Sequence, residues 1–207
     1  MNNTIIKHLS TASRLTIILA LFTGIVFPFI VWALAHLLFS QQAEGSFLHN
    51  KEGMIIGSML IGQNFNKPQY FHPRPSAAGN GYDTLASGGT NLGPTSKKLI
   101  EGLGNSFLGI KQLAQKYRQE NNLSADAKIP VEAITYSASG LDPHISVNNA
   151  LLQAPRVAQN RHIPLTLVLA LVKTYSKPRQ FGFLGEPVVN VLELNLHLDK
   201  NSTQPTE

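Results

Sequence analysis

The stretch LTIILALFTGIVFPFIVWALAHLLF, residues 15–39, decides the architecture of this 207-residue chain. It runs for 25 residues without an Asp, Glu, Lys or Arg, and no other stretch of the chain does so. Because an α-helix rises ~1.5 Å per residue, the stretch would be ~37 Å long, against a hydrocarbon core of ~30 Å. The sequence therefore predicts one membrane-spanning helix with some tilt.

Two alternatives for this stretch are a cleaved signal peptide and a buried core helix. The apolar part of a signal peptide is ~7–15 residues long, shorter than the stretch seen here. Ala33 and Ala35 match the small-x-small cleavage pattern, but the apolar run continues to Phe39. We therefore expect a retained anchor, and a cleaved chain would instead be secreted as a soluble protein.

Charged residues at the two ends of the stretch indicate its orientation. Lys7 and Arg14 precede it, whereas Gln41, Gln42 and Glu44 follow it. Since positive residues favour the cytoplasmic side, the N-terminus is expected in the cytoplasm. The predicted organisation is a cytoplasmic tail at residues 1–14, a transmembrane helix at 15–39 and one exported domain at 40–207.

The composition after the anchor is that of an ordinary exported domain. All 12 acidic and 15 of the 17 basic residues follow residue 39, which leaves a net charge of about +3 there. So small an excess does not predict nucleic-acid binding. The sequence has no cysteine, which excludes disulfides, Cys-ligated zinc and thiol catalysis and is compatible with an oxidising compartment.

Small residues recur every fourth position within the anchor. Thr16, Ala20 and Gly24 would share one helix face, where another transmembrane helix can approach closely. The alternative is that such a stripe arises by chance in an apolar segment. Pro28 lacks the N–H that would bond four residues back, so we expect a kink near the middle of the helix unless a neighbour compensates.

Hydrophobic periodicity predicts a mixed α/β domain with a small sheet after the anchor. Helical segments show apolar residues on one face, whereas Leu192, Leu194, Leu196 and Leu198 alternate with polar residues as in a half-buried strand. The expected elements are a β-like run at 54–65, an ordered or disordered loop at 67–94, a helix at 96–121, an extended segment at 131–136, helices from about 146 and 164, and a strand at 191–198.

Motifs for common chemistries are missing from the sequence. It contains no phosphate-binding P-loop, no Asp-Lys-Thr-Gly phosphorylation motif, no His-Glu-x-x-His and no Gly-x-Ser-x-Gly. None of the seven histidines pairs with another at the spacing of a helical metal site. Residues 87–89, Ser-Gly-Gly, are similar to the core of the signature motif of ABC transporters, with a tight turn as the alternative.

A membrane-tethered periplasmic serine hydrolase is the alternative function from a different class. Its nucleophile would be Ser139 or Ser87, and its base His144 or His72. No recognised order of nucleophile, base and orienting acid supports this assignment.

Several long polar strings identify a family. Together they resemble the C subunit of the bacterial Kdp high-affinity potassium-transporting P-type ATPase over residues 15–199, anchor included. The strings are GSMLIGQ (57–63), YFHPRPS (70–76), YD (82–83), SGGTNLGP (87–94), SASGLDPHIS (137–146), RVA (156–158) and NVLELN (190–195).

The resemblance implies a non-catalytic accessory subunit of a hetero-oligomeric inner-membrane complex. In that family an A subunit conducts potassium and a B subunit hydrolyses ATP. The C subunit is needed for assembly and is described as a catalytic chaperone that raises ATP affinity. This chain would then bind no cofactor of its own, since ATP and potassium belong to its partner subunits. For an exported domain, any effect on cytoplasmic ATP must be indirect.

The candidate contacts with these partners are Arg74, Asp83, Asn91 and Asp142. Arg74 stands between two prolines, so its guanidinium is either presented to a partner or held by a carboxylate within the domain. Asp83, Asp142 and Glu193 either raise the local cation concentration or cap turns and helices. With the anchor packed on partner helices, the domain is expected to cap the periplasmic mouth of the potassium pathway.

Overall fold

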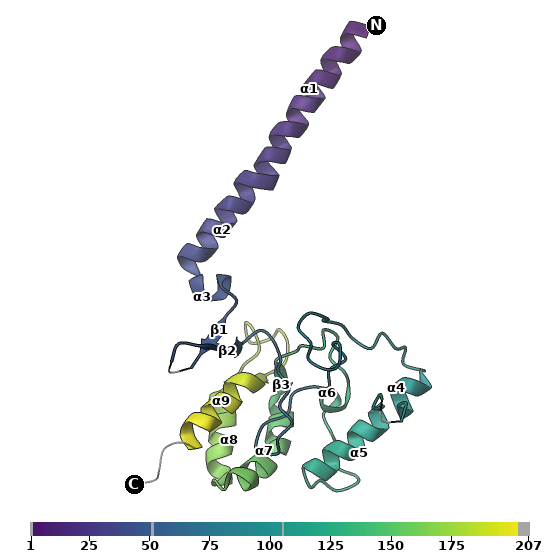
Figure 1. Ribbon diagram of the computed structural model, residues 1–207, viewed down its shortest axis with the longest axis vertical. Coiled ribbons are helices and arrows are strands. Elements are labelled where there is room, and N and C mark those ends of the chain that lie inside the picture. The colour runs from purple at the N-terminus through teal and green to yellow at the C-terminus, as the bar shows by residue number, and fades with distance from the viewer. Residues whose placement is uncertain (1, 51, 105, 203–207) are drawn as a thin grey trace. The chain divides into compact units, whose positions relative to one another are not determined.

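The computed structural model describes residues 2–50, 52–104 and 106–202 of the chain. The chain divides into two compact units, Met1–Ile55 and Ile56–Glu207. In the first unit, α1 (Asn2–Leu21), the π-helix η1 (Phe22–Val26) and α2 (Phe27–Leu38) follow one another as one continuous helix (Figure 1).

This helix confirms the predicted single apolar helix. Its segment Thr4–Leu38 is long and apolar enough to cross a membrane, and the described residues contain no second helix that is. The helix begins well before residue 15, because polar residues of its first turns also adopt helical geometry; Thr11, for example, donates its hydroxyl to the Lys7 carbonyl at 3.0 Å. Its large apolar side chains are exposed, so the first unit leaves them uncovered.

The π-helix η1 lies directly before Pro28, where the sequence predicts a kink. The Phe27 N–H bonds to the Phe22 carbonyl, five residues back, in place of the usual four. Pro28 has no N–H to offer the carbonyl of Gly24, and a local widening of this kind is a known way for helices to absorb a proline. The irregularity is therefore where the sequence placed it.

Short elements follow the long helix. They are α3 (Ser40–Ala43), β1 (Phe47–His49) and β2 (Ile55–Ser58). The boundary between the two units falls inside β2, which belongs to a two-stranded sheet. The predicted β-like run at 54–65 is thus a strand only in its first part, and residues 59–61 form a turn and bend.

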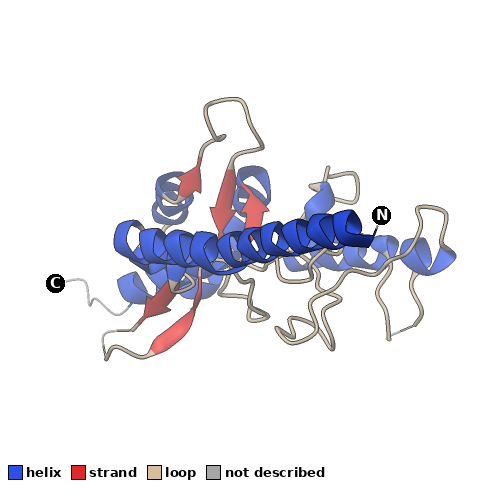
Figure 2. Cartoon of the chain, turned by 90° about the horizontal axis from the view of Figure 1, so that it is seen from above, coloured by secondary structure: helices blue, strands red, loops and turns tan. Residues whose placement is uncertain are grey.

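The second unit is a mixed α/β domain with a small sheet, as predicted. The sheet order is β3-β5-β4, both pairs are antiparallel, and Ile145 and Ser176 both face Val189. Figure 2 shows how short the strands are beside the helices. The elements are α4 (Lys97–Glu101), α5 (Ile110–Glu120), α6 (Val131–Ile134), β3 (His144–Ser146), α7 (Val147–Arg161), α8 (Leu165–Thr174), β4 (Ser176–Lys177), β5 (Val188–Asn190) and α9 (Val191–Ser202).

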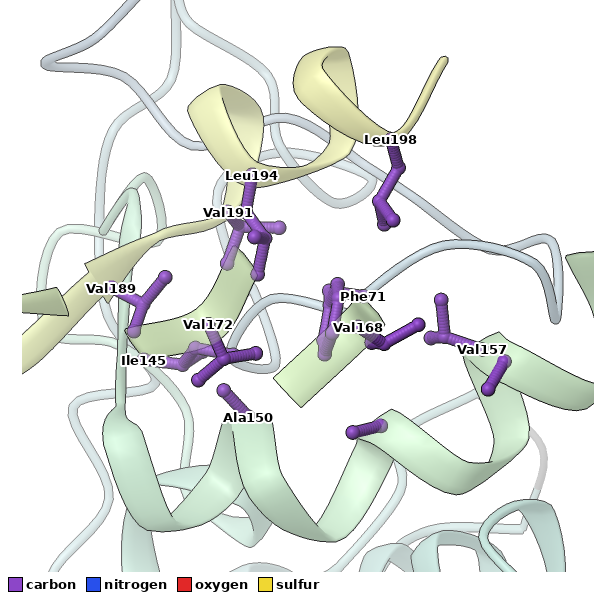
Figure 3. Packing of buried hydrophobic residues seen from close by; sticks show 12 residues of the cluster. Phe71, Ile145, Ala150, Val157, Val168, Val172, Val189, Val191, Leu194 and Leu198 are labelled. Carbon is purple, nitrogen blue, oxygen red and sulfur yellow. The ribbon is translucent and has the colours of Figure 1, made fainter. Parts of the chain in front are cut away.

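The hydrophobic core of the domain lies between α7, α8, α9 and the three-stranded sheet. Figure 3 shows side chains of α9 facing those of α7 and α8, with Phe71 between them. Each fully buried valine, leucine, isoleucine or phenylalanine side chain stabilises the fold by ~1.5–3 kcal/mol. The core cluster comprises Phe71, Ile145, Ala150, Ala154, Val157, Ala158, Val168, Val172, Val189, Val191, Leu194 and Leu198.

Phe71 comes from the long segment 67–94, which contains no helix or strand. The segment is nevertheless ordered, since Phe71 and Ala78 are fully buried. Asn195 of α9 accepts a hydrogen bond from the Phe71 N–H at 2.9 Å and donates to its carbonyl at 3.0 Å. Of the two alternatives left by the sequence, the ordered loop is confirmed.

The predicted strand at 191–198 is wrong, because these residues form helix α9. Its buried side chains are Val191, Leu194, Asn195 and Leu198, spaced as on one helix face, together with Leu192. The preceding Asn190 accepts the Glu193 N–H at 3.0 Å, as an N-cap does. The alternating leucines concealed this second, helical period.

The predicted helix at 96–121 is two helices, α4 and α5. Ser96 caps the first, accepting the Leu99 N–H at 3.4 Å. Gly102 then adopts φ +89° and Gly104 φ +55°, which a regular helix does not allow. Gly102 and Gly104 therefore interrupt the predicted helix.

The predicted extended segment at 131–136 contains a short helix, α6. Pro130, with its fixed φ, directly precedes α6, and Ala133 is the buried residue of this helix. The Glu132 carboxylate accepts a hydrogen bond from Ser146. Tertiary contacts of this kind outweigh the β-propensity of the branched residues in the segment. The expected helices from 146 and 164 are confirmed as α7 and α8.

Candidate functional site: a polar pocket in the domain

A pocket of about 480 Å³ opens in the second unit. Its walls come from residues 64–66, the ordered loop at 72–76, and helices α5 and α7. Aromatic rings and amide side chains make up much of the lining, with a few charged groups among them. The lining residues are Asn64, Phe65, Asn66, His72, Pro73, Arg74, Pro75, Ser76, Tyr82, Leu108, Leu113, Lys116, Tyr117, Glu120, Ala133, Tyr136, Asn149 and Gln153.

Arg156 of α7 lies next to this pocket and holds the ordered loop in place. It is 5% exposed, and its Nη1 donates to the carbonyls of Pro68 at 2.5 Å and Tyr70 at 2.9 Å. Its Nε donates to Asn121 Oδ1 at 3.0 Å and its Nη2 to Gln153 Oε1 at 2.8 Å. Burial lowers the pKa of Arg156. One guanidinium thus joins α5, α7 and the loop.

Polar side chains of α5 and α7 continue this network into the pocket wall. The Tyr117 hydroxyl and Gln153 Nε2 both donate to Asn149 Oδ1, at 2.7 and 2.8 Å. Gln153 also bonds to both backbone groups of His72, accepting from the N–H at 2.7 Å and donating to the carbonyl at 3.1 Å. Burial raises the pKa of Tyr117, so the hydroxyl stays a donor.

His72 is the titratable side chain at the edge of this network. Its Nδ1 lies 3.5 Å from Glu120 Oε2, and its Nε2 lies 3.1 Å from the Lys67 carbonyl. The pKa of Glu120 is lowered: burial acts to raise it, but the hydrogen bond and charge of His72 and the charge of Lys116 act together against burial. The carboxylate therefore stays charged at neutral pH.

Arg74, which lines the pocket, forms an ion pair with Asp142, so two of the candidate partner contacts meet. Arg74 Nη1 donates to Asp142 Oδ2 at 2.9 Å, and both side chains are partly exposed. Tyr82 donates its hydroxyl to the Arg74 carbonyl, and burial raises the pKa of Tyr82. Asp142 Oδ1 also accepts the His144 N–H at 3.0 Å. Of the two alternatives for Arg74, the structure places it on a carboxylate of its own domain.

The other two candidate contacts, Asp83 and Asn91, lie on the exposed part of the ordered loop and do not line the pocket. Asp83 accepts the Leu85 N–H at 2.9 Å. It therefore caps a turn, which is one of the two roles expected for the acidic residues. Asn91 adopts φ +52°, a conformation that asparagine tolerates better than most residues. The structure therefore brings together Arg74 and Asp142 but not all four candidates.

The predicted packing face lies in the first unit. Thr16 and Ala20 belong to α1, whereas Gly24 belongs to the π-helix η1, and all three are exposed. A Cβ added at Gly24 would meet nothing within 4 Å. The face is thus open along its length.

The hydrolase alternative receives no support. Ser139 Oγ lies 3.2 Å from Ser137 Oγ and accepts the Leu141 N–H, while Ser87 donates to the Ser139 carbonyl. The hydrogen bonds and ion pairs of the two histidines involve other residues, as described above. Within the described residues no group of three or more His, Cys, Asp or Glu is placed to hold a metal ion.

Residues 87–89 pack against the segment that contains Ser139. The Gly88 N–H donates to the Ser139 carbonyl at 2.9 Å. A Cβ at Gly89 would lie 2.9 Å from the Ala138 carbonyl oxygen, so the glycine allows two backbone segments to approach closely. The Gly88 N–H is thus already used in a hydrogen bond within the domain. Internal packing therefore accounts for the Ser-Gly-Gly sequence that is similar to a transporter signature motif.

Sequence reasoning missed the residues at the centre of the network, Asn149, Gln153 and Arg156. They follow one another at intervals of four and three on α7 and are at most 5% exposed. Polar residues at the buried positions of a helix are the signal that would have found them, because buried polar groups require partners. Their partners on the loop, some 80 residues away, carry no comparable signal.

One apolar helix that its own unit leaves uncovered, together with a small α/β domain, defines a class of single-helix membrane proteins with one extramembrane domain. The sequence matches the KdpC family, described as "K+-transporting ATPase, c chain", over residues 9–200. The chain belongs to this family.

Relatives agree along nearly the whole chain. A "Potassium-transporting ATPase KdpC subunit" of Mycobacterium tuberculosis (strain CDC 1551 / Oshkosh) is 48% identical over 194 residues, covering 94% of this chain and 98% of the relative. The protein of the same description from Koribacter versatilis is 46% identical over 200 residues, with 97% and 98% covered. That of Acidobacterium capsulatum is 48% identical over 194 residues, with 94% and 98% covered.

Proposed function

We propose that this chain is the non-catalytic accessory subunit of an ATP-driven, high-affinity potassium uptake complex and is needed for its assembly. The observation that carries the proposal is the family match, which extends over residues 9–200 and so covers both units. The relatives are named as subunits of a potassium-transporting ATPase. A single helix cannot enclose an ion pathway, so potassium conduction and ATP hydrolysis belong to partner subunits.

The proposed topology has residues 1–14 in the cytoplasm, residues 15–39 in the membrane and residues 40–207 in the periplasm. Lys7 and Arg14 before the uncharged stretch at residues 15–39, with no acidic residue among the first 39, favour this orientation. An exported domain cannot touch ATP bound in the cytoplasm. Any effect on the ATP affinity of the catalytic subunit is then transmitted through the partner subunits.

The anchor is proposed to pack on partner helices through Thr16, Ala20 and Gly24. Support comes from their exposure on the helix and from the open space beside Gly24. In lipid, helices associate by close packing, for which small side chains leave room. The exported domain then caps the periplasmic mouth of the potassium pathway.

The ion pair of Arg74, which lines the pocket, with Asp142 is the proposed contact of the domain with a partner. Both side chains keep about a quarter of their surface exposed while paired with each other, 23% and 30% respectively. Asp83 and Asn91, both exposed, extend the proposed contact along the ordered loop. The backbone of these four residues is already ordered within the domain, so little conformational entropy is lost when a partner binds.

The test is co-purification of the tagged full chain with the other subunits from detergent-solubilised membranes. Mass spectrometry identifies the subunits that come with it, and the intact mass shows whether the first ~35 residues are retained. Ala20→Leu and Gly24→Leu should each reduce the recovery of partner subunits, because leucine fills the space that a partner helix needs.

Ala33→Leu is the matched control, since it makes the same change on another face of the helix. It should leave the recovery unchanged. Equal recovery with all three variants would refute the packing face. Purification of the chain without any other subunit would refute the accessory role itself.

A further inference from the structure

The loop between β4 and β5, residues 178–187, presents large apolar side chains to the surroundings. Phe181 is 87% exposed, Phe183 71% and Leu184 46%. The other phenylalanines of the second unit are all buried or half-buried: Phe65, Phe71 and Phe107. The tip of this hairpin therefore forms an apolar surface that its own domain does not cover.

The tip is already shaped in the free chain. Gln180 and Leu184 exchange backbone hydrogen bonds at 3.0 and 2.9 Å, and Arg179 Nη2 contacts both carboxylate oxygens of Glu186 at 2.8 and 2.7 Å. Phe181 adopts φ +53°, which costs an L-residue of this size ~1 kcal/mol or more. Packing within the domain does not repay this strain, since the ring is exposed.

Basic residues lie in this loop and just before it in the sequence. Lys173, Lys177 and Arg179 are all exposed, and residues 173–185 contain no Asp or Glu. Arg179 pairs with Glu186, and Lys177 Nζ lies 3.8 Å from Glu193 Oε2, whose side chain is 23% exposed. Exposed aromatic and aliphatic residues with lysines close by in the sequence are a combination that binds the interface of an anionic bilayer.

The connection of the domain to the apolar helix keeps this hairpin within reach of a bilayer. Asn190, at the end of β5, donates to the Met59 carbonyl at 2.7 Å, so the sheet of the hairpin lies beside the start of the second unit. The apolar helix ends at Leu38, and residues 39–55 extend over ~60 Å at most. Tethering of this kind gives the tip a high effective concentration at the membrane surface.

We propose that the tip formed by Phe181, Phe183 and Leu184 inserts into the interface of the bilayer that holds the anchor, with Lys173 and Lys177 at anionic headgroups. The domain then has a second membrane contact besides its helix. This contact restricts the rotation of the domain about the connecting segment. The proposal rests on the proposed membrane anchor, and the experiment separates the two.

The test uses the full chain in nanodiscs of phosphatidylcholine and phosphatidylglycerol, with and without brominated acyl chains that quench tryptophan. The native chain has a single tryptophan, Trp32, which lies in the apolar helix and reports insertion of the anchor. In a Trp32→Phe background, Phe181→Trp reports the tip. Leu85→Trp in the same background is the matched control, because Leu85 is 96% exposed on a different loop.

Brominated lipid should quench Trp32 in the native chain and reduce the emission of Phe181→Trp about twofold, while Leu85→Trp stays unquenched. Lys173→Gln with Lys177→Gln, or omission of phosphatidylglycerol, should weaken the quenching of Phe181→Trp. Quenching of Trp32 without quenching of Phe181→Trp would overturn the proposal and leave the anchor intact.

Two further outcomes would also overturn the proposal. If Phe181→Trp in the assembled complex resists aqueous acrylamide yet escapes brominated lipid, a partner protein covers the tip. If Trp32 itself escapes quenching, the membrane anchor is wrong and the inference fails with it.

Discussion

Replacing Arg156 by methionine tests whether the guanidinium network holds the pocket together. Arg156 is 5% exposed and donates to four residues: the carbonyls of Pro68 and Tyr70, and the side chains of Asn121 and Gln153. Methionine keeps a long, unbranched side chain in the same space but donates no hydrogen bond.

The expected loss is about 3–5 kcal/mol in the free energy of unfolding. Gln153 Oε1 keeps its bond from the His72 N–H at 2.7 Å, so it is not orphaned. The carbonyls of Pro68 and Tyr70 and the amide oxygen of Asn121 lose this donor, at ~1–3 kcal/mol each where no water replaces it. Favourable transfer of the apolar methionine offsets part of the sum.

Pulse proteolysis of the full chain in detergent across a urea series gives the free energy of unfolding of the domain. Arg118→Met is the matched control, because Arg118 is half-buried and donates one bond, to the Ala127 carbonyl at 3.3 Å. It should cost less than about 1 kcal/mol. Arg156→Lys should fall between the two, since lysine keeps the charge but not the fork of donors.

The reasoning is refuted if Arg156→Met lowers the free energy of unfolding no more than Arg118→Met does. A large loss that Arg156→Lys fully restores would assign the effect to charge alone and would contradict the role given to the hydrogen-bond geometry.

Three other substitutions test separate features of the domain. Burial lowers the pKa of His144, so its imidazole takes up a proton more readily in the unfolded chain than in the folded one. The free energy of unfolding therefore falls as the pH drops below ~6.5. His144→Asn should flatten this pH dependence, measured by urea unfolding between pH 7.5 and 5. Gly109→Ala places a Cβ against the backbone nitrogen of Gly102 and should cost about 1–3 kcal/mol in the same assay. Asn195→Ala orphans the buried N–H and carbonyl of Phe71 and should cost about 2–4 kcal/mol, with limited proteolysis cutting residues 67–94 faster.

Each of these expectations has a clear opposite. An unchanged pH dependence in His144→Asn would show that other groups control acid stability. Native stability of Gly109→Ala would mean that the α4–α5 turn yields easily. If Asn195→Ala leaves proteolysis of the loop unchanged, the side-chain bonds to Phe71 do not order it.

Local patterns in the sequence were sufficient for the apolar helix and for two helices of the domain. The apolar helix follows from uninterrupted hydrophobic composition, which lipid demands of any span. Ser146 caps α7, and Val168 and Val172 of α8 are buried four residues apart, as amphipathic periodicity requires. In these segments the local preference and the tertiary packing agree, so either alone predicts the element.

The last helix, α9, shows where local pattern failed. Its leucines at even positions satisfy a period of two, while Val191, Leu194 and Leu198 satisfy a helical period. Which period prevails depends on Asn190 as a cap and on the groove between α7, α8 and Phe71. A single sequence does not reveal that groove.

The pocket was beyond prediction for a similar reason. Arg74 and Asp142 were both candidates, but the bond between them joins residues 68 positions apart. Gln153 meets the backbone of His72 across 81 positions. No periodicity connects such partners, so Arg74 and Asp142 were predicted as candidates without their arrangement, and Gln153 was not predicted at all.

The two bonds between Asn195 and Phe71 set an order of events during biosynthesis. They join positions 124 residues apart, one in the loop that precedes most of the domain and one in its last helix. At ~5–20 residues per second, α9 is synthesised several seconds after the loop. Until then the loop lacks its final partner, so the core around Phe71 is among the last features to form, and a chain whose synthesis ends before residue 195 keeps an open core.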